Sequence, residues 1–160
     1  MSELRIGLGI DAHAFADGVP LVLGGVRFDD QPRGLAGHSD GDVVAHALVD
    51  ALLGAAGQGD IGSLFPSGDD RWQGADSLDL LAEAWRRVTG EGWTLVNADC
   101  VLVGEEPRIA GRRDEMAARL AAALGVPAAA ITVRATTTDG LGFTGRGEGL
   151  GAQAVALLRR

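Results

Sequence analysis

The spacing of apolar residues along the chain predicts several β-strands. Short apolar runs bounded by glycine, proline or polar residues are typical of strands, and they occupy residues 5–13, 20–28, 93–104 and 131–138. In the first run, Ile6, Leu8 and Ile10 alternate and therefore share one face. The second run is expected to form a hairpin that turns at Gly24 and Gly25, because a missing Cβ permits a positive φ.

Helical spacing predicts three helices. The first is nearly all apolar; Ser39 or Asp40 is expected to cap its start, and Gly57 with Gly59 to end it after about Ala56. The other two are amphipathic and cover residues 77–89 and 112–124.

The remaining segments are predicted loops, with one exception. Residues 29–37 and 60–76 are expected to be irregular, whereas residues 147–158 fit either a helix or a strand. Strands dispersed among helices indicate an α+β or α/β layered domain, and 160 residues suffice for one such domain.

The charge of the chain restricts its partners. A net charge of −8 argues against nucleic acid and anionic membranes as partners. All 14 basic residues are arginine, so a bound phosphate must be held by guanidinium groups, backbone N–H groups, hydroxyls or a metal.

Cysteine usage and hydropathy complete the compositional picture. Cys100 is the only cysteine, lies in an apolar run and is expected to be buried. No apolar stretch has the length of a signal peptide or of a membrane span of ~20 residues. We therefore expect a soluble cytoplasmic protein.

Three residues form a candidate metal site. Asp11 and His13 project to the same side of the first strand, and His46 lies within the apolar first helix. Two histidines and a carboxylate are a common ligand set for catalytic zinc. Asp42 and Asp50 lie four residues either side of His46, and Asp50 is the preferred residue to orient a ligand histidine. The alternative is a core histidine bonded to a backbone carbonyl.

Two segments suggest phosphate binding. His38 and Ser39 precede the first helix, and helix N-termini attract anions. Residues 135–149 gather threonines, glycines, Asp139 and Arg146, of which Asp139 can hold a hard cation such as Mg²⁺. Simple turns remain the alternative for the glycine-rich stretch.

Five segments together resemble the 2-C-methyl-D-erythritol 2,4-cyclodiphosphate synthase family of the non-mevalonate isoprenoid pathway. They are GIDAHAF, HSDGDVVAHALVDALLGAAG, GDIGSLFP, GADS with LLAEAWRRV, and ATTTDGLGFTGRGEG. The resemblance implies an α+β two-layer sandwich, with helices on one face of a mixed β-sheet. It also implies a homotrimer whose sheets pack around a threefold axis, with active sites between subunits, and it favours a strand for residues 147–158.

The resemblance also assigns roles. Asp11, His13 and His46 match zinc ligands, while His38 and Thr137 match transition-state stabilisers. A Mg²⁺ or Mn²⁺ ion is implied to bridge the substrate diphosphate, with Asp139 as its ligand. The implied substrate-binding residues are Ser39, Asp60, Ile61, Gly62, Phe65, Pro66, Ser67, Gly68, Asp69, Gly104, Pro107, Arg108, Ile109, Ala110, Thr136, Thr138, Phe143 and Arg146.

Three positions depart from the family pattern. Asp139 replaces a glutamate that is one methylene longer, so direct ligation of the second cation is in question. Ser67 replaces a frequent aspartate, which removes a charge. Arg108 replaces a frequent lysine, which keeps the charge but changes its geometry.

The implied reaction cyclises a cytidine-diphosphate substrate and releases CMP. One alternative is a metal-dependent phosphohydrolase built on the same ligands. Another is a non-catalytic trimer that binds isoprenoid diphosphates in an axial cavity, near Arg146 and Glu148.

Overall fold

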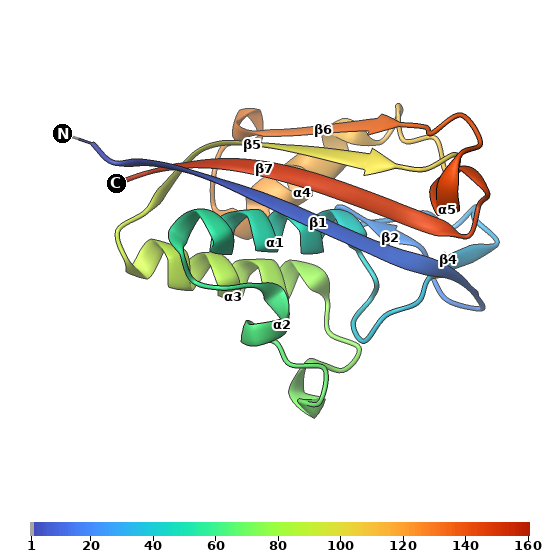
Figure 1. Cartoon of the computed structure of the whole chain (residues 1–160), viewed down its shortest axis with the longest axis horizontal. Helices are drawn as coiled ribbons and strands as arrows, with labels where there is room; N and C mark the ends of the chain where they lie inside the picture. Colours follow the sequence, from blue (N-terminus) through green and yellow to red (C-terminus); the bar gives the residue numbers. More distant parts are fainter. Residues whose placement is uncertain (1) are drawn as a thin grey trace.

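A computed structural model describes residues 2–160 and contains one five-stranded sheet (Figure 1). The spatial order of the strands is β4 (Arg33–Leu35), β1 (Leu4–Asp17), β7 (Gly149–Arg159), β5 (Thr94–Val103) and β6 (Ile131–Thr136). Only β5 and β6 pair in parallel. The sheet is therefore mixed, as predicted, and residues 147–158 contribute a strand and not a helix.

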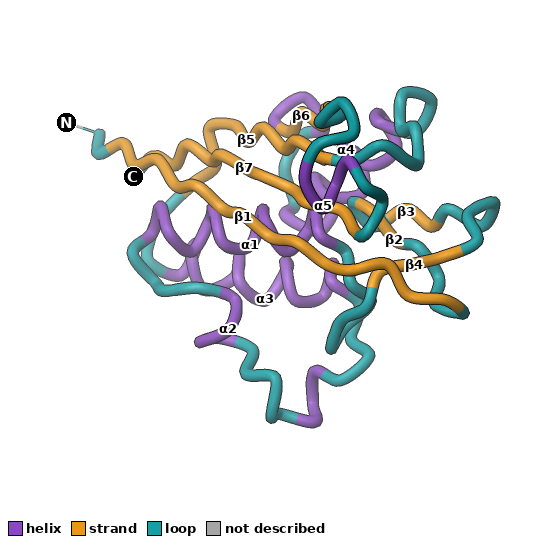
Figure 2. The backbone as a smooth tube through the Cα atoms, turned by 45° about the vertical axis from the view of Figure 1, so that its right-hand side comes forward, coloured by secondary structure: helices purple, strands orange, loops and turns teal. Residues whose placement is uncertain are grey.

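The long helices all lie on one side of the sheet (Figures 1 and 2). Helices α1 (Val43–Ala56) and α4 (Arg113–Leu124) contact the strands, whereas α3 (Ser77–Gly90) packs mainly on α1 and α4. The predicted arrangement of helices on one face is confirmed. The core lies between this helical layer and the sheet, and it is built mainly from leucine, valine and alanine.

Short elements complete the fold. A separate hairpin pairs β2 (Val22–Leu23) with β3 (Val26–Arg27), and it turns at Gly24 and Gly25, both with positive φ as expected. Helices α2 (Ile61–Leu64) and α5 (Gly142–Gly145) and two 3₁₀ turns, Asp70–Trp72 and Ala128–Ala130, interrupt segments predicted as loops or strand ends. No helix within residues 2–160 has both the length and the hydropathy to cross a bilayer.

Two glycines allow α1 to lie directly on β1. A Cβ atom at Gly7 would come within 1.9 Å of the Ala51 carbonyl oxygen, and one at Gly9 within 1.8 Å of the Ala47 oxygen. No side chain fits in that space, so the backbones of β1 and α1 touch. This contact places the C-terminal half of β1 beside the first turns of α1.

The other face of β1 is apolar and exposed. Ile6, Leu8 and Ile10 share one face, as predicted, and their exposed fractions are 73, 59 and 61%. Leu4 of β1 and Val155 of the adjoining strand β7 extend this surface, which no helix of the described chain covers. From Leu4 to Ile10 the large apolar side chains of β1 thus point away from the core, and Gly7 and Gly9 point into it.

The start of α1 differs from the prediction. Its N-cap is Asp42, whose side chain accepts a hydrogen bond from the Ala45 N–H, and not Ser39 or Asp40. The sequence alone allowed several caps, because polar residues occupy each position from His38 to Asp40. The end of the helix is as expected: Gly57 adopts a left-handed conformation with φ of 71°.

Candidate active site

The three candidate metal ligands converge from two elements. Asp11 and His13 are alternate residues of β1 on the side that faces α1, and His46 lies on the first turn of that helix. The Asp11 Oδ2 atom is 2.9 Å from His13 Nε2 and 3.0 Å from His46 Nδ1, and the two nitrogens are 3.3 Å apart. The close contact of β1 with α1 through Gly9 makes this approach possible.

Hydrogen bonds on the far side of each ring leave lone pairs facing one another. His13 Nδ1 is 2.6 Å from the Ala36 carbonyl oxygen, which can only accept, so that nitrogen carries the proton. His46 Nε2 lies 2.8 Å from the Ser77 hydroxyl. With neutral rings protonated on those nitrogens, three acceptor atoms meet at one point, and a cation would satisfy all of them.

The spacing suits zinc in particular. Ligand atoms at the usual Zn–N distance of ~2.0–2.1 Å in a tetrahedral site are about 3.3 Å apart, close to the separations found here. The same three residues are the one group of metal-ligating side chains that converges within residues 2–160. The residues present therefore fit the metal that the sequence predicts.

The electrostatics of the cluster agree with a cation site. Burial alone would raise the pKa of Asp11, but hydrogen bonds from His13 and His46 outweigh it and lower the pKa to about 2. The hydrogen bond to Asp11 raises the pKa of His13, against the opposite effect of burial.

The two aspartates that flank His46, Asp42 and Asp50, are hydrogen-bonded to backbone groups and not to His46. Asp42 is fully buried and accepts hydrogen bonds from Gly24 N and Gly25 N at 2.8 and 2.7 Å. Asp50 Oδ1 accepts from Ile61 N at 2.7 Å. Within residues 2–160 neither carboxylate is hydrogen-bonded to a ligand histidine, so the prediction that Asp50 orients one is corrected.

Asp42 and Asp50 instead attach neighbouring segments to α1. Asp42 joins the start of the helix to the β2–β3 turn, and Asp50 holds the first residue of α2. Burial raises the pKa of both carboxyl groups, to about 6 for Asp42, although backbone N–H donors oppose that effect in each case.

A hollow of about 180 Å³ opens next to the metal cluster. Besides the three ligands, its lining includes six residues predicted to bind substrate or stabilise the transition state, namely His38, Ser39, Ile61, Gly62, Phe65 and Ser67. Trp72 and Leu80 also line it, although neither was predicted from the sequence as a site residue. Phe65 and Trp72 meet edge to face, with ring centroids 4.7 Å apart.

The nearby loop is organised by its aspartates. Asp60 caps α2 through a reciprocal capping box with Ser63, and Asp69 caps the 3₁₀ turn and pairs with Arg71. Pro66 and Gly68 lie between these two caps. The expected loop therefore contains two turns whose polar ends set the shape of the hollow.

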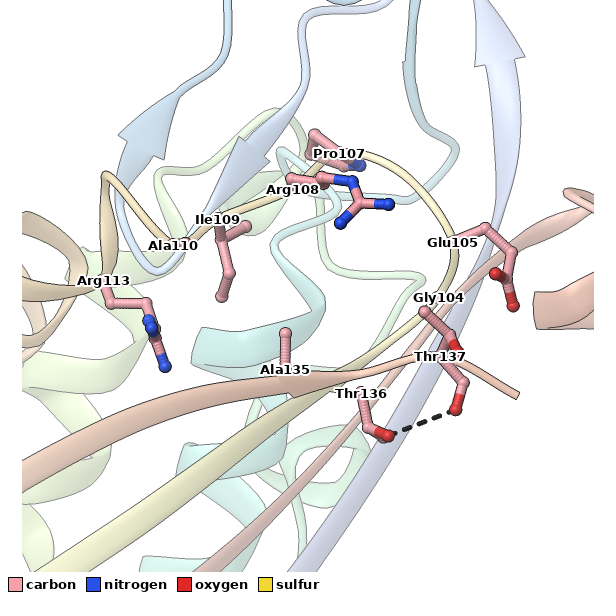
Figure 3. A pocket seen from close by; sticks show the side chains of 10 residues that line it. All are labelled: Gly104, Glu105, Pro107, Arg108, Ile109, Ala110, Arg113, Ala135, Thr136 and Thr137. Atoms are coloured by element: carbon pink, nitrogen blue, oxygen red, sulfur yellow. Dashed lines mark hydrogen bonds between the residues drawn. The ribbon is translucent and has the colours of Figure 1, made fainter. Parts of the chain in front are cut away.

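A second hollow, of about 270 Å³, lies at the other predicted binding segment (Figure 3). The loop from Gly104 to Ala110 arches over the end of β6. The predicted residues that line it are Gly104, Pro107, Arg108, Ile109, Ala110, Thr136 and Thr137. Arg113, which sequence reasoning missed, adds a second guanidinium to this hollow.

The glycine-rich segment after β6 forms a tight turn. Asp139 has φ of 53° and its Oδ1 accepts a hydrogen bond of 3.3 Å from the Thr137 hydroxyl. Thr138 is bonded to the Thr144 hydroxyl at 3.0 Å. Asp139 does not belong to the group of converging metal ligands within residues 2–160.

Phe143 and Arg146 lie on the surface near this turn. Phe143 belongs to α5 and is 45% exposed, and Arg146 follows that helix and pairs with Glu148 at 3.0 Å.

The predicted site is therefore split within one chain. The hollow at the metal cluster and the hollow at the Gly104–Ala110 loop share no lining residue. Each is also smaller than the ~300–1,000 Å³ of a typical small-molecule site.

Two residues near His46 lie in motifs seen in the sequence, but their contact with each other could not be predicted. Ser77 belongs to the GADS segment and Asp40 to HSDGD, and the two side chains meet only because α3 packs against the start of α1. A serine at a helix start is normally a capping residue, so nothing in the sequence connected Ser77 with His46.

Comparisons with known proteins identify relatives along the full chain. The sequence model of the YgbB family matches residues 4–159. A 2-C-methyl-D-erythritol 2,4-cyclodiphosphate synthase from Rubrobacter xylanophilus is 59% identical, and the alignment covers 100% of this chain and 98% of the relative.

Solved structures agree in fold. A bifunctional IspDF from Campylobacter jejuni matches with a TM-score of 0.95 and 40% identity, over 99% of this chain and 43% of that longer one. A 2C-methyl-D-erythritol-2,4-cyclodiphosphate synthase described as a bound form with CDP matches with a TM-score of 0.87 and 40% identity. That alignment covers 96% of this chain and 99% of the other.

Proposed function

This chain belongs to the YgbB family and has 2-C-methyl-D-erythritol 2,4-cyclodiphosphate synthase relatives along its full length, and on that premise we propose its reaction. It converts 4-diphosphocytidyl-2-C-methyl-D-erythritol 2-phosphate to 2-C-methyl-D-erythritol 2,4-cyclodiphosphate and CMP. In chemical class it is a phosphorus–oxygen lyase that cyclises its substrate. The observation that carries the proposal is the converging set of Asp11, His13 and His46 beside a hollow lined by the predicted substrate residues.

The chemistry requires little proton transfer. An oxygen of the 2-phosphate forms a bond to the β-phosphorus of the diphosphate, and the bond from that phosphorus to the CMP oxygen breaks. CMP leaves with the electron pair. Because the nucleophile is already an anion, the site needs no activated serine or cysteine. The difficulty is to bring two negatively charged groups together, which is an electrostatic task.

The metal would be held by Asp11, His13 and His46. When bound, zinc there and a second Mg²⁺ or Mn²⁺ ion supply positive charge that offsets the repulsion between the phosphates. His38 and Ser39, at the edge of the hollow, present a ring N–H and a hydroxyl to the phosphates. Thr137 contributes a hydroxyl from the other hollow.

The second hollow is the proposed cytidine site. Its loop offers backbone N–H and C=O groups, and Arg108 and Arg113 offer positive charge for the diphosphate. Relatives solved with CDP support a nucleotide of this kind. Asp139, in the turn next to Thr137, is proposed to reach the second cation.

The complete site is proposed to form between subunits of a homotrimer. The metal hollow of one chain and the cytidine hollow of its neighbour would then make one cavity that holds the whole substrate. The exposed apolar face of β1, formed by Leu4, Ile6, Leu8 and Ile10, supports such an assembly, because patches of this kind mark interaction surfaces.

One experiment tests the proposed function against the phosphohydrolase alternative. The purified protein is incubated with substrate, Zn²⁺ and Mg²⁺ in ¹⁸O-labelled water and followed by ³¹P NMR. We expect CMP and the cyclic diphosphate, with no label in either. Label in the released phosphate would indicate hydrolysis, and no turnover by metallated protein would contradict both activities. Binding of an isoprenoid diphosphate that survives His46→Ala, in a protein without turnover, would favour the non-catalytic binder.

A further inference from the structure

His46 is held from behind by a buried serine. Ser77, the first residue of α3, has no exposed surface, and its Oγ atom lies 2.8 Å from His46 Nε2. The same hydroxyl is hydrogen-bonded to Asp40 Oδ1, and the Ser77 N–H donates to Asp40 Oδ2 at 3.0 Å. Asp40 thus binds both the hydroxyl and the amide of one residue.

The chemistry of these groups fixes where the protons lie. A carboxylate can only accept, so the single hydroxyl proton of Ser77 points to Asp40. The Ser77 oxygen then offers a lone pair to His46 Nε2, so with a cation at Nδ1 the one proton of the neutral ring is held at Nε2. A neutral ring protonated at Nε2 has its lone pair on Nδ1. That atom faces Asp11 Oδ2 at 3.0 Å and His13 Nε2 at 3.3 Å.

Of the other polar neighbours of His46, Asp11 faces Nδ1, the nitrogen that would bind the metal, and the rest do not hold Nε2 as firmly as Ser77 does. The Ser39 hydroxyl lies 3.0 Å from the same nitrogen and 3.3 Å from Ser77 Oγ, but Ser39 is partly exposed and lines the hollow. It can turn toward a ligand, whereas Ser77 is enclosed. Asp50 is occupied by the Ile61 N–H.

We propose that Asp40 and Ser77 are positioning residues, which hold His46 as the Nε2–H tautomer and so aim its Nδ1 lone pair at the metal. Hydrogen bonds join Asp40 to Ser77 and Ser77 to His46. This is a carboxylate–histidine–metal arrangement in which a serine lies between the carboxylate and the histidine. The inference rests on the proposed function for its metal, whereas the contacts that join Asp40, Ser77 and His46 belong to the chain alone.

The test measures the tautomer and zinc affinity separately. In zinc-loaded protein labelled with ¹⁵N-histidine, NMR is expected to show an Nε2 proton on His46 that exchanges slowly with water, and Ser77→Ala is expected to make that proton exchange faster. Competition with a chromophoric chelator is expected to show zinc binding weakened by about 10–100-fold in Ser77→Ala. Asp40→Asn, which leaves Ser77 in place, is expected to weaken zinc binding as well. This variant provides the test if Ser77→Ala does not fold.

Two controls separate positioning from loss of stability. Asp76→Ala removes the N-cap of the same helix and should lower the Tm without changing zinc affinity, because the Asp76 side chain bonds only to the Leu78 N–H. Ser39→Ala should leave zinc affinity within about threefold, whatever it does to turnover.

The outcomes distinguish this inference from the proposed function. If wild-type protein binds no zinc, the metal part of the proposed function is wrong. If wild type binds zinc but folded Ser77→Ala and Asp40→Asn bind it equally well, the positioning role is wrong. An equal loss in Ser39→Ala would also overturn it.

Discussion

At the scale of single residues, the pKa values of Asp11 and Asp42 shift in opposite directions because their hydrogen-bond partners and their burial differ. Asp11 meets two histidines and its pKa falls to about 2, whereas Asp42 meets only backbone N–H groups in a buried place, where its pKa rises to about 6. Within residues 2–160 Asp42 pairs with no cation, and yet its carboxylate is fully hydrogen-bonded, since the N–H groups of Gly24, Gly25 and Ala45 all donate to it. Its role is to fasten the hairpin to α1.

Removal of the Asp42 side chain should therefore be costly. Asp42→Ala leaves three N–H groups without an acceptor, at ~1–3 kcal/mol for each buried group, so we expect a loss of about 3 kcal/mol or more in the free energy of unfolding. Asp76→Ala, which removes an exposed cap with one acceptor bond, should cost only about 1 kcal/mol. Urea denaturation of both variants checks this. Equal losses would contradict the anchoring role of Asp42.

Cys100 should link stability to alkaline pH. Burial first, and then nearby Asp99 and Asp42, raise the pKa of its thiol from the usual 9.0 to about 12. Because the folded-state pKa is the higher one, this contribution to stability is full below pH 9 and is lost as the pH rises toward 12. The chain has no tyrosine and its basic residues are all arginine, so no other side chain titrates in that range.

Urea denaturation at pH 8, 9, 10 and 11, in the presence of a metal chelator, measures this effect. We expect the free energy of unfolding to fall by about 1.4 kcal/mol per pH unit above pH 9 to 9.5. Cys100→Ala should start lower, because a buried sulfur is removed, but should then stay nearly level. Parallel curves for the two proteins would show that the thiol is not responsible.

At the scale of elements, the metal site depends on how closely α1 approaches β1. Gly9 lies two residues before Asp11, and the Ala47 carbonyl that it touches directly follows His46. A change in this spacing therefore moves the ligands of one element relative to those of the other. The glycines of β1 set the geometry of the cluster although none of them touches a ligand atom.

Gly9→Ala should disturb both stability and metal binding. Its Cβ would lie 1.8 Å from the Ala47 oxygen, so the helix must shift, and we expect a loss of about 3 kcal/mol with at least tenfold weaker zinc binding. Gly54→Ala is the matched control on α1, where nothing lies within 4 Å of the added atom. It should stabilise the protein by about 0.5–1 kcal/mol and leave zinc affinity unchanged. Thermal denaturation and chelator competition measure both effects, and an unaffected Gly9→Ala would refute this spacing argument.

Much of the element order could be predicted from the sequence, because periodicity depends on local sequence. The stripe of Met116, Leu120 and Leu124 is buried as its spacing implied. The cap of α1 could not be predicted, since which of several adjacent polar residues caps it depends on the hairpin that Asp42 holds. The partners of His46 were equally out of reach, because Ser77 arrives from a helix 31 positions away.

The alternation of β1 illustrates the same limit. It correctly placed Ile6, Leu8 and Ile10 on one face, but alternation alone does not tell which face meets the core. In this strand Gly7 and Gly9 occupy the core side, because the helix leaves no room for larger residues.

At the scale of the whole molecule, the arrangement of hollows and surfaces points beyond one chain. The metal hollow and the cytidine hollow are separate in the chain, and the apolar face of β1 is uncovered. Assembly around that face would bury its side chains and complete the cavity at the same time. Oligomerisation and activity should therefore be lost together, while metal binding should not.

Ile6→Glu tests this coupling. A charge at the most exposed isoleucine of the face should be unfavourable in an interface, so we expect the mass in sedimentation to fall from three times 16.4 kDa to a single chain. Turnover should fall below a hundredth, yet one zinc per chain should still bind, because all three ligands come from one chain. Ala118→Glu, on the exposed side of α4, is the control and should remain a trimer. An active monomer would exclude the shared site.

The pairing of β1 with β7 has a consequence for how the molecule folds. Eleven residue pairs join the beginning of the described chain, from Leu4, to its far end, at Arg159. During synthesis, β1 leaves the ribosome long before β7, so the backbone N–H and C=O groups along that edge of β1 have no partner in the meantime. Such distant pairing implies slow closure of the sheet. A nascent chain of this protein should therefore be a client for chaperones until its last strand emerges.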